Sequence, residues 1–169
     1  MSNHIDGMTL EEQIGQTLMV GFAGTTASRE VIELVQRYHV GNILLFSRNV
    51  RDAEQVRGLT RRLQGAAREA GHTHPLLIAI DQENGIVQRL GEAATLFPGN
   101  MALGAIGSQE VAFDVARATG RELKALGINM NLAPVVDVNN NAANPVIGVR
   151  SFGEDARLVA RLGSAMVRG

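Results

Sequence analysis

Short apolar runs alternate four times with amphipathic stretches along this chain of 169 residues. Between the runs, apolar residues recur at the three- and four-residue spacing of a helix that buries one face. The runs expected to form strands are residues 18–22, 43–46, 76–80 and 129–133. The expected helices follow Ser, Thr or Asp residues that suit the N-cap position, namely Thr9, Ser28, Asp52, Ser108 and Asp155. This alternation predicts an α/β fold with a parallel sheet.

Residues 76–80 are apolar at consecutive positions, which predicts a strand buried on both faces, as in a parallel sheet covered by helices. Two architectures suit the pattern. A doubly wound sheet of four or five strands needs about this length, whereas a closed eight-stranded barrel needs roughly 250 residues and would be only half present. Periodicity does not choose between them. No linker or low-complexity segment divides residues 1–169, so we expect a single domain.

Composition narrows the class of protein. Hydrophobic residues make up 45% of the chain and charged residues 20%, which is typical of a soluble globular protein. Sixteen basic and 17 acidic residues leave a net charge of -1, which argues against nucleic acid or an anionic membrane as a partner. The absence of cysteine excludes disulfides and thiol catalysis. The N-terminus is polar and no apolar run approaches the ~20 residues of a membrane span, so a cytoplasmic location is expected.

Several familiar sites are absent from the sequence. No two glycines stand two positions apart, which excludes the dinucleotide-binding fingerprint. The phosphate-binding P-loop and the G-x-S-x-G nucleophile motif are missing as well. His72 and His74 could clip a metal ion, but no third ligand lies near them in the sequence. We therefore expect no metal site.

Candidate chemistry follows the third expected strand. Asp81 comes directly after the buried run, at the carboxyl end of a strand, where parallel sheets bind ligands. Arg89, eight residues later, could return over the same edge as a hydrogen-bond donor. The alternatives are that Asp81 caps the turn and that Arg89 is solvated. We expect Glu83 to bond the amides of this loop rather than to form a catalytic pair with Asp81.

A second candidate lies in the long loop after the fourth expected strand, residues 134–153. This loop is rich in Asn, Pro and Gly, which is typical of an irregular but ordered series of turns. Arg150 stands there among apolar and small residues, and its guanidinium could project into a site. Alternatively, Arg150 packs its own loop by donating to carbonyl groups.

Residues 79–90, AIDQENGIVQRL, are similar to the D-x-E-G-G-x-V-x-R signature of glycoside hydrolase family 3, above all its β-N-acetylhexosaminidase branch. Residues 41–49 (GNILLFSRN), 97–105 (FPGNMALGA) and 134–153 resemble further motifs of the family, in the family's order. Two positions depart from the pattern. Asn84 replaces a glycine, although asparagine also tolerates the left-handed backbone, and Ala142 replaces a proline.

The resemblance implies a (β/α)8 barrel, of which this chain would supply about the first four β/α units. It also implies that Asp81, Arg89 and Arg150 bind the substrate sugar. The family's aspartate nucleophile and its Asp-His acid/base are expected beyond residue 169, so the catalytic residues are unknown and the chain alone is expected to be inactive. No cofactor is implied.

The activity implied by the resemblance is removal of terminal β-linked N-acetylglucosamine by a retaining double displacement. Cell-wall recycling, with muropeptide-derived sugars as substrates, is the expected setting. A family 3 β-glucosidase is one alternative. A non-catalytic sugar-binding protein is the other, if 169 residues are the native product. The aglycone, the choice between hydrolysis and phosphorolysis, and the oligomeric state stay open.

Overall fold

A computed structural model describes residues 7–169, which form two compact units. Unit 1 comprises the chain up to Ile80 together with Leu126–Met130, and unit 2 comprises Asp81–Ala125 and Asn131–Gly169. Residues 1–6, the start of the polar N-terminal segment, lie outside the described range. Whether residues 1–169 constitute one incomplete domain stays a prediction.

The expected sheet has four strands. They are β1 (Met19–Val20), β2 (Asn42–Leu45), β3 (Leu77–Ile80) and β4 (Met130–Asn131), in the spatial order β1-β2-β3-β4. Strand β2 pairs in parallel with β1 on one side and β3 on the other. The order follows the chain without the reversal that defines a doubly wound sheet, and therefore favours the barrel. Strands β1 and β4 are shorter than the runs predicted at residues 18–22 and 129–133.

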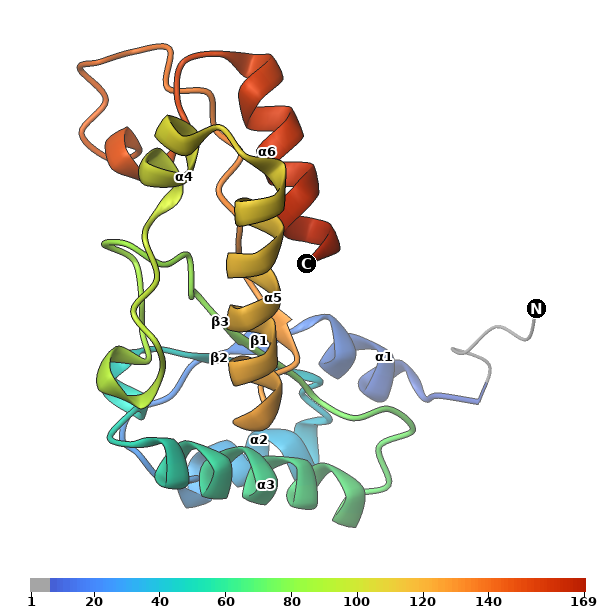
Figure 1. Ribbon diagram of the computed structural model, residues 1–169. Coiled ribbons are helices and arrows are strands. Elements are labelled where there is room, and N and C mark those ends of the chain that lie inside the picture. Colours follow the sequence, from blue (N-terminus) through green and yellow to red (C-terminus); the bar gives the residue numbers. More distant parts are fainter. Residues whose placement is uncertain (1–6) are drawn as a thin grey trace. The chain divides into compact units, whose positions relative to one another are not determined.

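The helices of unit 1 begin where the sequence predicts. They are α1 (Leu10–Thr17), α2 (Arg29–Tyr38) and α3 (Ala53–Glu69). A short 3-10 helix, η1 (Ser47–Asn49), precedes α3. The N-caps Thr9, Ser28 and Asp52 each accept a backbone N–H of the first turn, which satisfies a donor that the helix itself leaves unpaired. Helices α2 and α3 lie side by side next to the strands (Figure 1).

Strand β3 is central to the core of unit 1. Ile78, Ala79 and Ile80 are fully buried at consecutive positions, which confirms burial on both faces for this part of the predicted run. Leu77, in the same run, is 45% exposed, so the prediction is wrong at that position. Helix α3 is tied to the segment that leads into β4, because the buried Thr60 hydroxyl donates to the Leu126 carbonyl at 2.7 Å. This hydrogen bond joins two segments of unit 1 that are 66 residues apart in the sequence.

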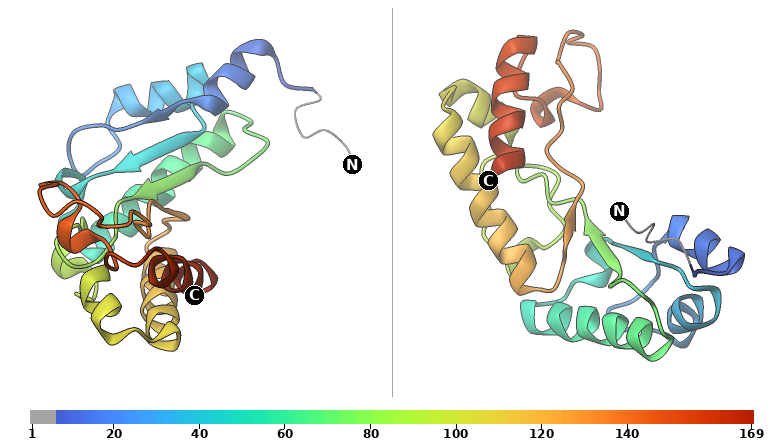
Figure 2. Two further views of the ribbon diagram at one scale, coloured as in Figure 1. Left: turned by 90° about the horizontal axis from the view of Figure 1, so that it is seen from above. Right: turned by 90° about the vertical axis from the view of Figure 1, so that its right-hand side faces the viewer.

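Unit 2 contains the loops that carry the candidate chemistry. Its helices are α4 (Asn100–Ile106), α5 (Gln109–Ala125) and α6 (Ala156–Arg168), with the 3-10 helices η2 (Gly91–Ala93) and η3 (Gly148–Arg150). Helices α5 and α6 pack side by side (Figure 2) around a core that includes Phe152 and Leu162. Helix α4 was not expected, because it begins after Gly99 without a side-chain cap and so lacks the N-cap signal of the others.

Candidate functional site

Asp81 and Arg89 lie together in the loop that follows β3. Arg89 Nη2 is 3.4 Å from Asp81 Oδ2, and the two side chains are 33% and 23% exposed, respectively. Arg89 Nε is buried and has no hydrogen-bond partner among the described residues. The structure therefore confirms that Arg89 returns to Asp81. Both groups keep hydrogen-bonding capacity beyond their single mutual contact, as residues that bind a polar ligand require.

The loop brings Arg89 back because a buried glutamine binds its backbone. Gln82 is 2% exposed, and its Oε1 accepts from the backbone N–H groups of Arg89 at 2.9 Å and Leu90 at 3.3 Å. Asn131, in β4, exchanges two hydrogen bonds of 3.0 Å with the backbone of Gln82. These amide side chains replace the backbone pairing that the chain loses where β3 ends.

A tight turn completes the loop between Asp81 and Arg89. Asn84 and Gly85 both have positive φ angles, of 68° and 60°, and the Glu83 N–H donates to the Val87 carbonyl at 2.9 Å. The left-handed backbone expected of Asn84 is confirmed. Gly85 approaches the backbone of Gly99 closely enough that a Cβ atom would clash there, so the turn also requires its second glycine.

Arg150 pairs with Glu83. Arg150 Nε and Nη2 donate to the two carboxylate oxygens of Glu83 at 2.9 and 2.7 Å, and the Glu83 side chain is only 6% exposed. The expectation that Glu83 bonds loop amides is wrong, since a guanidinium from a distant loop takes both of its oxygens. Arg150 also donates through Nη1 to the Val146 carbonyl at 3.3 Å, so the alternative in which it bonds a carbonyl of its own loop is partly realised, while its projection into a site stays a prediction.

Electrostatics favour the charged form of this arginine. The hydrogen bonds to Glu83 raise the pKa of the Arg150 guanidinium above its ordinary value, and the charges of Glu83, Asp137 and Asp81 act in the same direction, while burial opposes them. The two ion pairs, Asp81 with Arg89 and Glu83 with Arg150, carry equal numbers of positive and negative charges. Each pair is neutral by itself, and the polar groups of both pairs suit a ligand that forms hydrogen bonds.

The backbone of Arg150 is held independently of its side chain. Asn100, at the start of α4, is 2% exposed and donates through Nδ2 to the carbonyls of Arg150 at 2.8 Å and Val135 at 3.3 Å. The next residues, Ser151 and Phe152, are buried, and the Ser151 hydroxyl donates to the Asp137 carbonyl at 2.6 Å. The loop of residues 134–153 is therefore anchored on both sides of η3.

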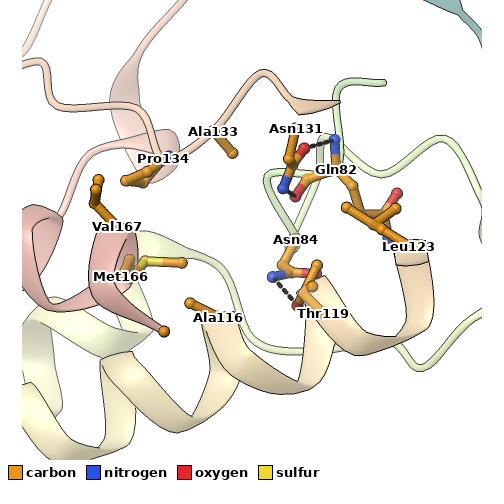
Figure 3. Close-up of a pocket in the computed structure, with 12 residues that line it drawn as sticks. Gln82, Asn84, Ala116, Thr119, Leu123, Asn131, Ala133, Pro134, Met166 and Val167 are labelled. Atoms are coloured by element: carbon orange, nitrogen blue, oxygen red, sulfur yellow. Dashed lines mark hydrogen bonds between the residues drawn. The ribbon is translucent and has the colours of Figure 1, made fainter. Parts of the chain in front are cut away.

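A cavity of about 260 Å³ in unit 2 borders the loop that follows β3. Asn84, Thr119 and Asn131 contribute polar groups to its wall, and Met166 and Val167 contribute apolar ones (Figure 3). Asn84 Nδ2 donates to Thr119 Oγ1 at 3.2 Å, while Asn84 Oδ1 has no partner among the described residues. Asp81, Arg89 and Arg150 do not line this cavity, although Gln82 and Asn131, which hold the Asp81 loop, do.

Neither a metal cluster nor a membrane helix is found in residues 7–169. No group of three or more His, Asp or Glu side chains in this range could hold a metal ion. His72 Nε2 lies 2.9 Å from the Val35 carbonyl, and its ring is tilted by 35° to that of His39, with the ring centroids 5.5 Å apart. None of the helices in the same range is long and apolar enough to cross a membrane.

Sequence reasoning missed three residues that organise this site. Gln82 and Asn131 hold the Asp81 loop, and Asn100 holds the Arg150 loop. Each is an amide next to the end of a strand or a loop, where backbone groups lose their regular partners. That position is the signal that could have identified them. Glu83 was noticed, but its partner stands 67 residues away and no local pattern indicates it.

Residues 9–169 match the glycosyl hydrolase family 3 N terminal domain. The chain belongs to this family. Among curated relatives, it is 44% identical over 181 residues to "Beta-hexosaminidase A" of Pseudoalteromonas piscicida, and the match covers 95% of this chain and 30% of the relative. It is 35% identical to the "Beta-hexosaminidase" of Xylella fastidiosa (strain M23), with 90% of this chain and 45% of the relative covered. The chain thus spans less than half the length of these relatives.

Among solved structures, a family 3 β-N-acetylglucosaminidase from Paenibacillus sp. str. FPU-7 superposes with a TM-score of 0.93 at 52% identity. That match covers 96% of this chain and 31% of the other. The structure of NagZ from Neisseria gonorrhoeae in complex with N-trifluoroacetyl-D-glucosamine gives a TM-score of 0.81 at 33% identity, covering 89% of this chain and 45% of the other. The α/β fold expected for the first units of the family 3 barrel is confirmed. The substrate-binding roles of Asp81, Arg89 and Arg150 stay predictions.

Proposed function

We propose that the protein is a retaining family 3 glycosidase that removes terminal β-linked N-acetylglucosamine. The observation that carries the proposal is the pair of neighbouring, mutually neutralising ion pairs that begins directly after β3, Asp81 with Arg89 and Glu83 with Arg150. Family membership and the names of the relatives, β-hexosaminidase and β-N-acetylglucosaminidase, support this substrate class.

Sugar hydroxyl groups both donate and accept hydrogen bonds, and the site offers both kinds of partner. The Asp81 carboxylate is an acceptor that makes charge-assisted bonds of roughly 1.5–3 kcal/mol with hydroxyl donors. The guanidinium groups of Arg89 and Arg150 are donors only. We infer that Asp81 and Arg89 hold adjacent hydroxyls of the terminal sugar and that Arg150 donates to a third oxygen.

Double displacement needs two further carboxyl groups, a nucleophile and an acid/base, which flank the scissile bond about 5–5.5 Å apart. Asp81 and Glu83 are each engaged by an arginine, which suits binding and support rather than attack on carbon. We therefore propose that both catalytic groups belong to the part of the family 3 domain that follows residue 169 in sequence. The described residues would bind the sugar and orient it.

The biological setting belongs to the same proposal. We infer a cytoplasmic enzyme that acts on muropeptide-derived sugars during recycling of the cell wall. Subcellular fractionation with an antibody to this chain tests the location, and recovery of the protein with the membrane or outside the cell would contradict it.

The activity is tested with the product of the complete reading frame that contains residues 1–169. We expect hydrolysis of an aryl N-acetyl-β-glucosaminide with retention of configuration, and much weaker hydrolysis of the matching aryl β-glucoside. The reverse preference would identify a β-glucosidase. Binding of N-acetylglucosamine without turnover would identify a sugar-binding protein. The 169-residue chain assayed alone should show no turnover above background, since loss of a nucleophile or acid/base costs factors of roughly 10⁴ to 10⁶ in covalent mechanisms.

A further inference from the structure

Glu83 is a buried carboxylate whose hydrogen bonds, among residues 7–169, go to a single side chain. Both of its oxygens accept from Arg150, at 2.9 and 2.7 Å, and no other side-chain hydrogen bond of Glu83 is present among the described residues. We propose that Glu83 is a positioning residue, which fixes the plane of the Arg150 guanidinium so that its remaining N–H groups meet the substrate. The inference rests on the function proposed above.

The arrangement leaves donors available for a ligand. An arginine carries five N–H groups. Glu83 takes one from Nε and one from Nη2, and the Val146 carbonyl takes one from Nη1. One N–H on Nη1 and one on Nη2 therefore stay unbonded among the described contacts. The Arg150 side chain is 24% exposed, so these groups are accessible to a bound molecule.

Fixing this side chain matters because a free arginine samples many rotamers, and a ligand would have to select one of them. A bidentate carboxylate holds the planar guanidinium in a single orientation before the ligand arrives. Glu83 itself is well placed to do so, since the turn at Asn84 begins next to it and its backbone N–H is bonded to Val87.

The loop that carries Arg150 does not depend on Glu83. Asn100 holds the Arg150 carbonyl, and Ser151 holds the Asp137 carbonyl, through contacts that Glu83 does not share. Removal of the Glu83 carboxylate should therefore release the guanidinium while the backbone of the loop stays in place. A change in substrate binding without a change in the stability of the loop would therefore distinguish a positioning role from a purely structural one.

Charge provides a second readout. In the wild-type site Glu83 is the direct ion-pair partner of Arg150, and replacing its carboxylate by an amide removes one negative charge beside the guanidinium, where Asp137 and Asp81 still act. A guanidinium with one negative charge fewer beside it attracts anions more strongly. Glu83→Gln should consequently bind an anionic sugar better, relative to a neutral one, than the wild type does.

The experiment uses the complete protein and compares Glu83→Gln, Glu83→Asp and Arg150→Ala with the double variant E83Q/R150A. Glu92→Gln is the matched control, because Glu92 is exposed in the same unit. Steady-state kinetics use the aryl N-acetyl-β-glucosaminide, and competition compares glucuronic acid with N-acetylglucosamine. Thermal melting gives the folded fraction used for normalisation.

We expect Glu83→Gln to raise KM about tenfold, the effect of one charge-assisted hydrogen bond, with a smaller change in kcat. Its preference for glucuronic acid over N-acetylglucosamine should rise severalfold, and both effects should disappear in the Arg150→Ala background. Glu83→Asp shortens the side chain but keeps its charge, so it should raise KM without changing that preference.

The inference is overturned if Glu83→Gln and Glu83→Asp behave like Glu92→Gln, or if the effects of Glu83→Gln persist undiminished in the double variant. If Glu83→Gln does not fold, the KM of Glu83→Asp tests the positioning role: a raised KM supports it, and a KM equal to that of Glu92→Gln overturns it. A wild-type protein without activity or binding towards the sugar would instead remove the proposed function itself, and the role of Glu83 with it.

Discussion

The two ion pairs of unit 2 join the same residue types in different ways. Asp81 and Arg89 stand eight residues apart in one loop and share a single contact of 3.4 Å between side chains that are 23% and 33% exposed. Glu83 and Arg150 are 67 residues apart and share two contacts, of 2.9 and 2.7 Å, with Glu83 only 6% exposed. In the first pair both side chains keep hydrogen-bonding capacity beyond their single contact, whereas in the second both carboxylate oxygens are occupied and the Arg150 guanidinium is fixed in orientation.

The difference follows from how each arginine is anchored. Arg89 is placed by its backbone, whose N–H is held by Gln82, so its side chain reaches Asp81 without a second constraint. Arg150 is held both by its backbone carbonyl and by its guanidinium. An enclosed, bidentate pair loses less conformational freedom per hydrogen bond than an exposed single contact does.

The largest effect on activity is expected at the Asp81–Arg89 pair. Asp81→Ala should lower kcat/KM of the complete protein by at least ~100-fold, because it removes a charge-assisted bond to the substrate and strands the charge of Arg89. Asp81→Asn should be milder, since the amide still accepts one bond. Kinetics on both variants, normalised to the folded fraction, measure this. If Asp81 only caps the turn, the loss should track the melting temperature instead, and a well-folded Asp81→Ala protein with wild-type kcat/KM would remove it from the site.

The anchor of Arg89 provides the next test. Gln82→Ala should lower the free energy of unfolding by about 2 kcal/mol, because it leaves the part-buried N–H of Arg89 and the buried N–H of Leu90 without their acceptor. Urea denaturation measures this loss, and Gln109→Ala, at an exposed position of the same unit, is the control. An unfolding free energy equal to that of the control would show that Gln82 does not hold this loop.

The smallest expected effects are the coupling free energies within the two ion pairs, which allow the pairs to be compared directly. Double-mutant cycles on the free energy of unfolding, with Asp81→Asn and Arg89→Gln, should give a coupling of about 0.5 kcal/mol or less, as for other partly exposed ion pairs. The cycle with Glu83→Gln and Arg150→Gln should give about 1.5 kcal/mol, since it breaks two bonds to a buried carboxylate. Equal coupling energies would contradict the distinction between the partly exposed Asp81–Arg89 pair and the more buried Glu83–Arg150 pair.

Features that depend on neighbouring residues were predictable. The N-caps at Thr9, Ser28 and Asp52 and the burial of residues 78–80 follow from local hydrogen bonding and from the apolar pattern. Helix α4 lacks such a signal, because Gly99 contributes no capping side chain, and the pattern did not show it. Strands β1 and β4 are short, and the apolar runs that contain them are half-buried or exposed, with Leu18 at 45% and Leu132 at 36% exposure. An apolar run by itself therefore indicates neither burial nor the extent of strand pairing.

The sequence by itself determined the α/β class, the place of Asp81 after a buried strand, and, through the family's motifs, the three residues proposed to bind the sugar. Only the tertiary structure decided that Arg150 meets Glu83, that Gln82 holds Arg89, and that Asn100 anchors the loop of Arg150. The physical reason is the range of the interactions. Capping and periodicity act within a few residues, whereas the partner of a buried charge or amide is whichever complementary group the packing of distant segments brings within about 3 Å.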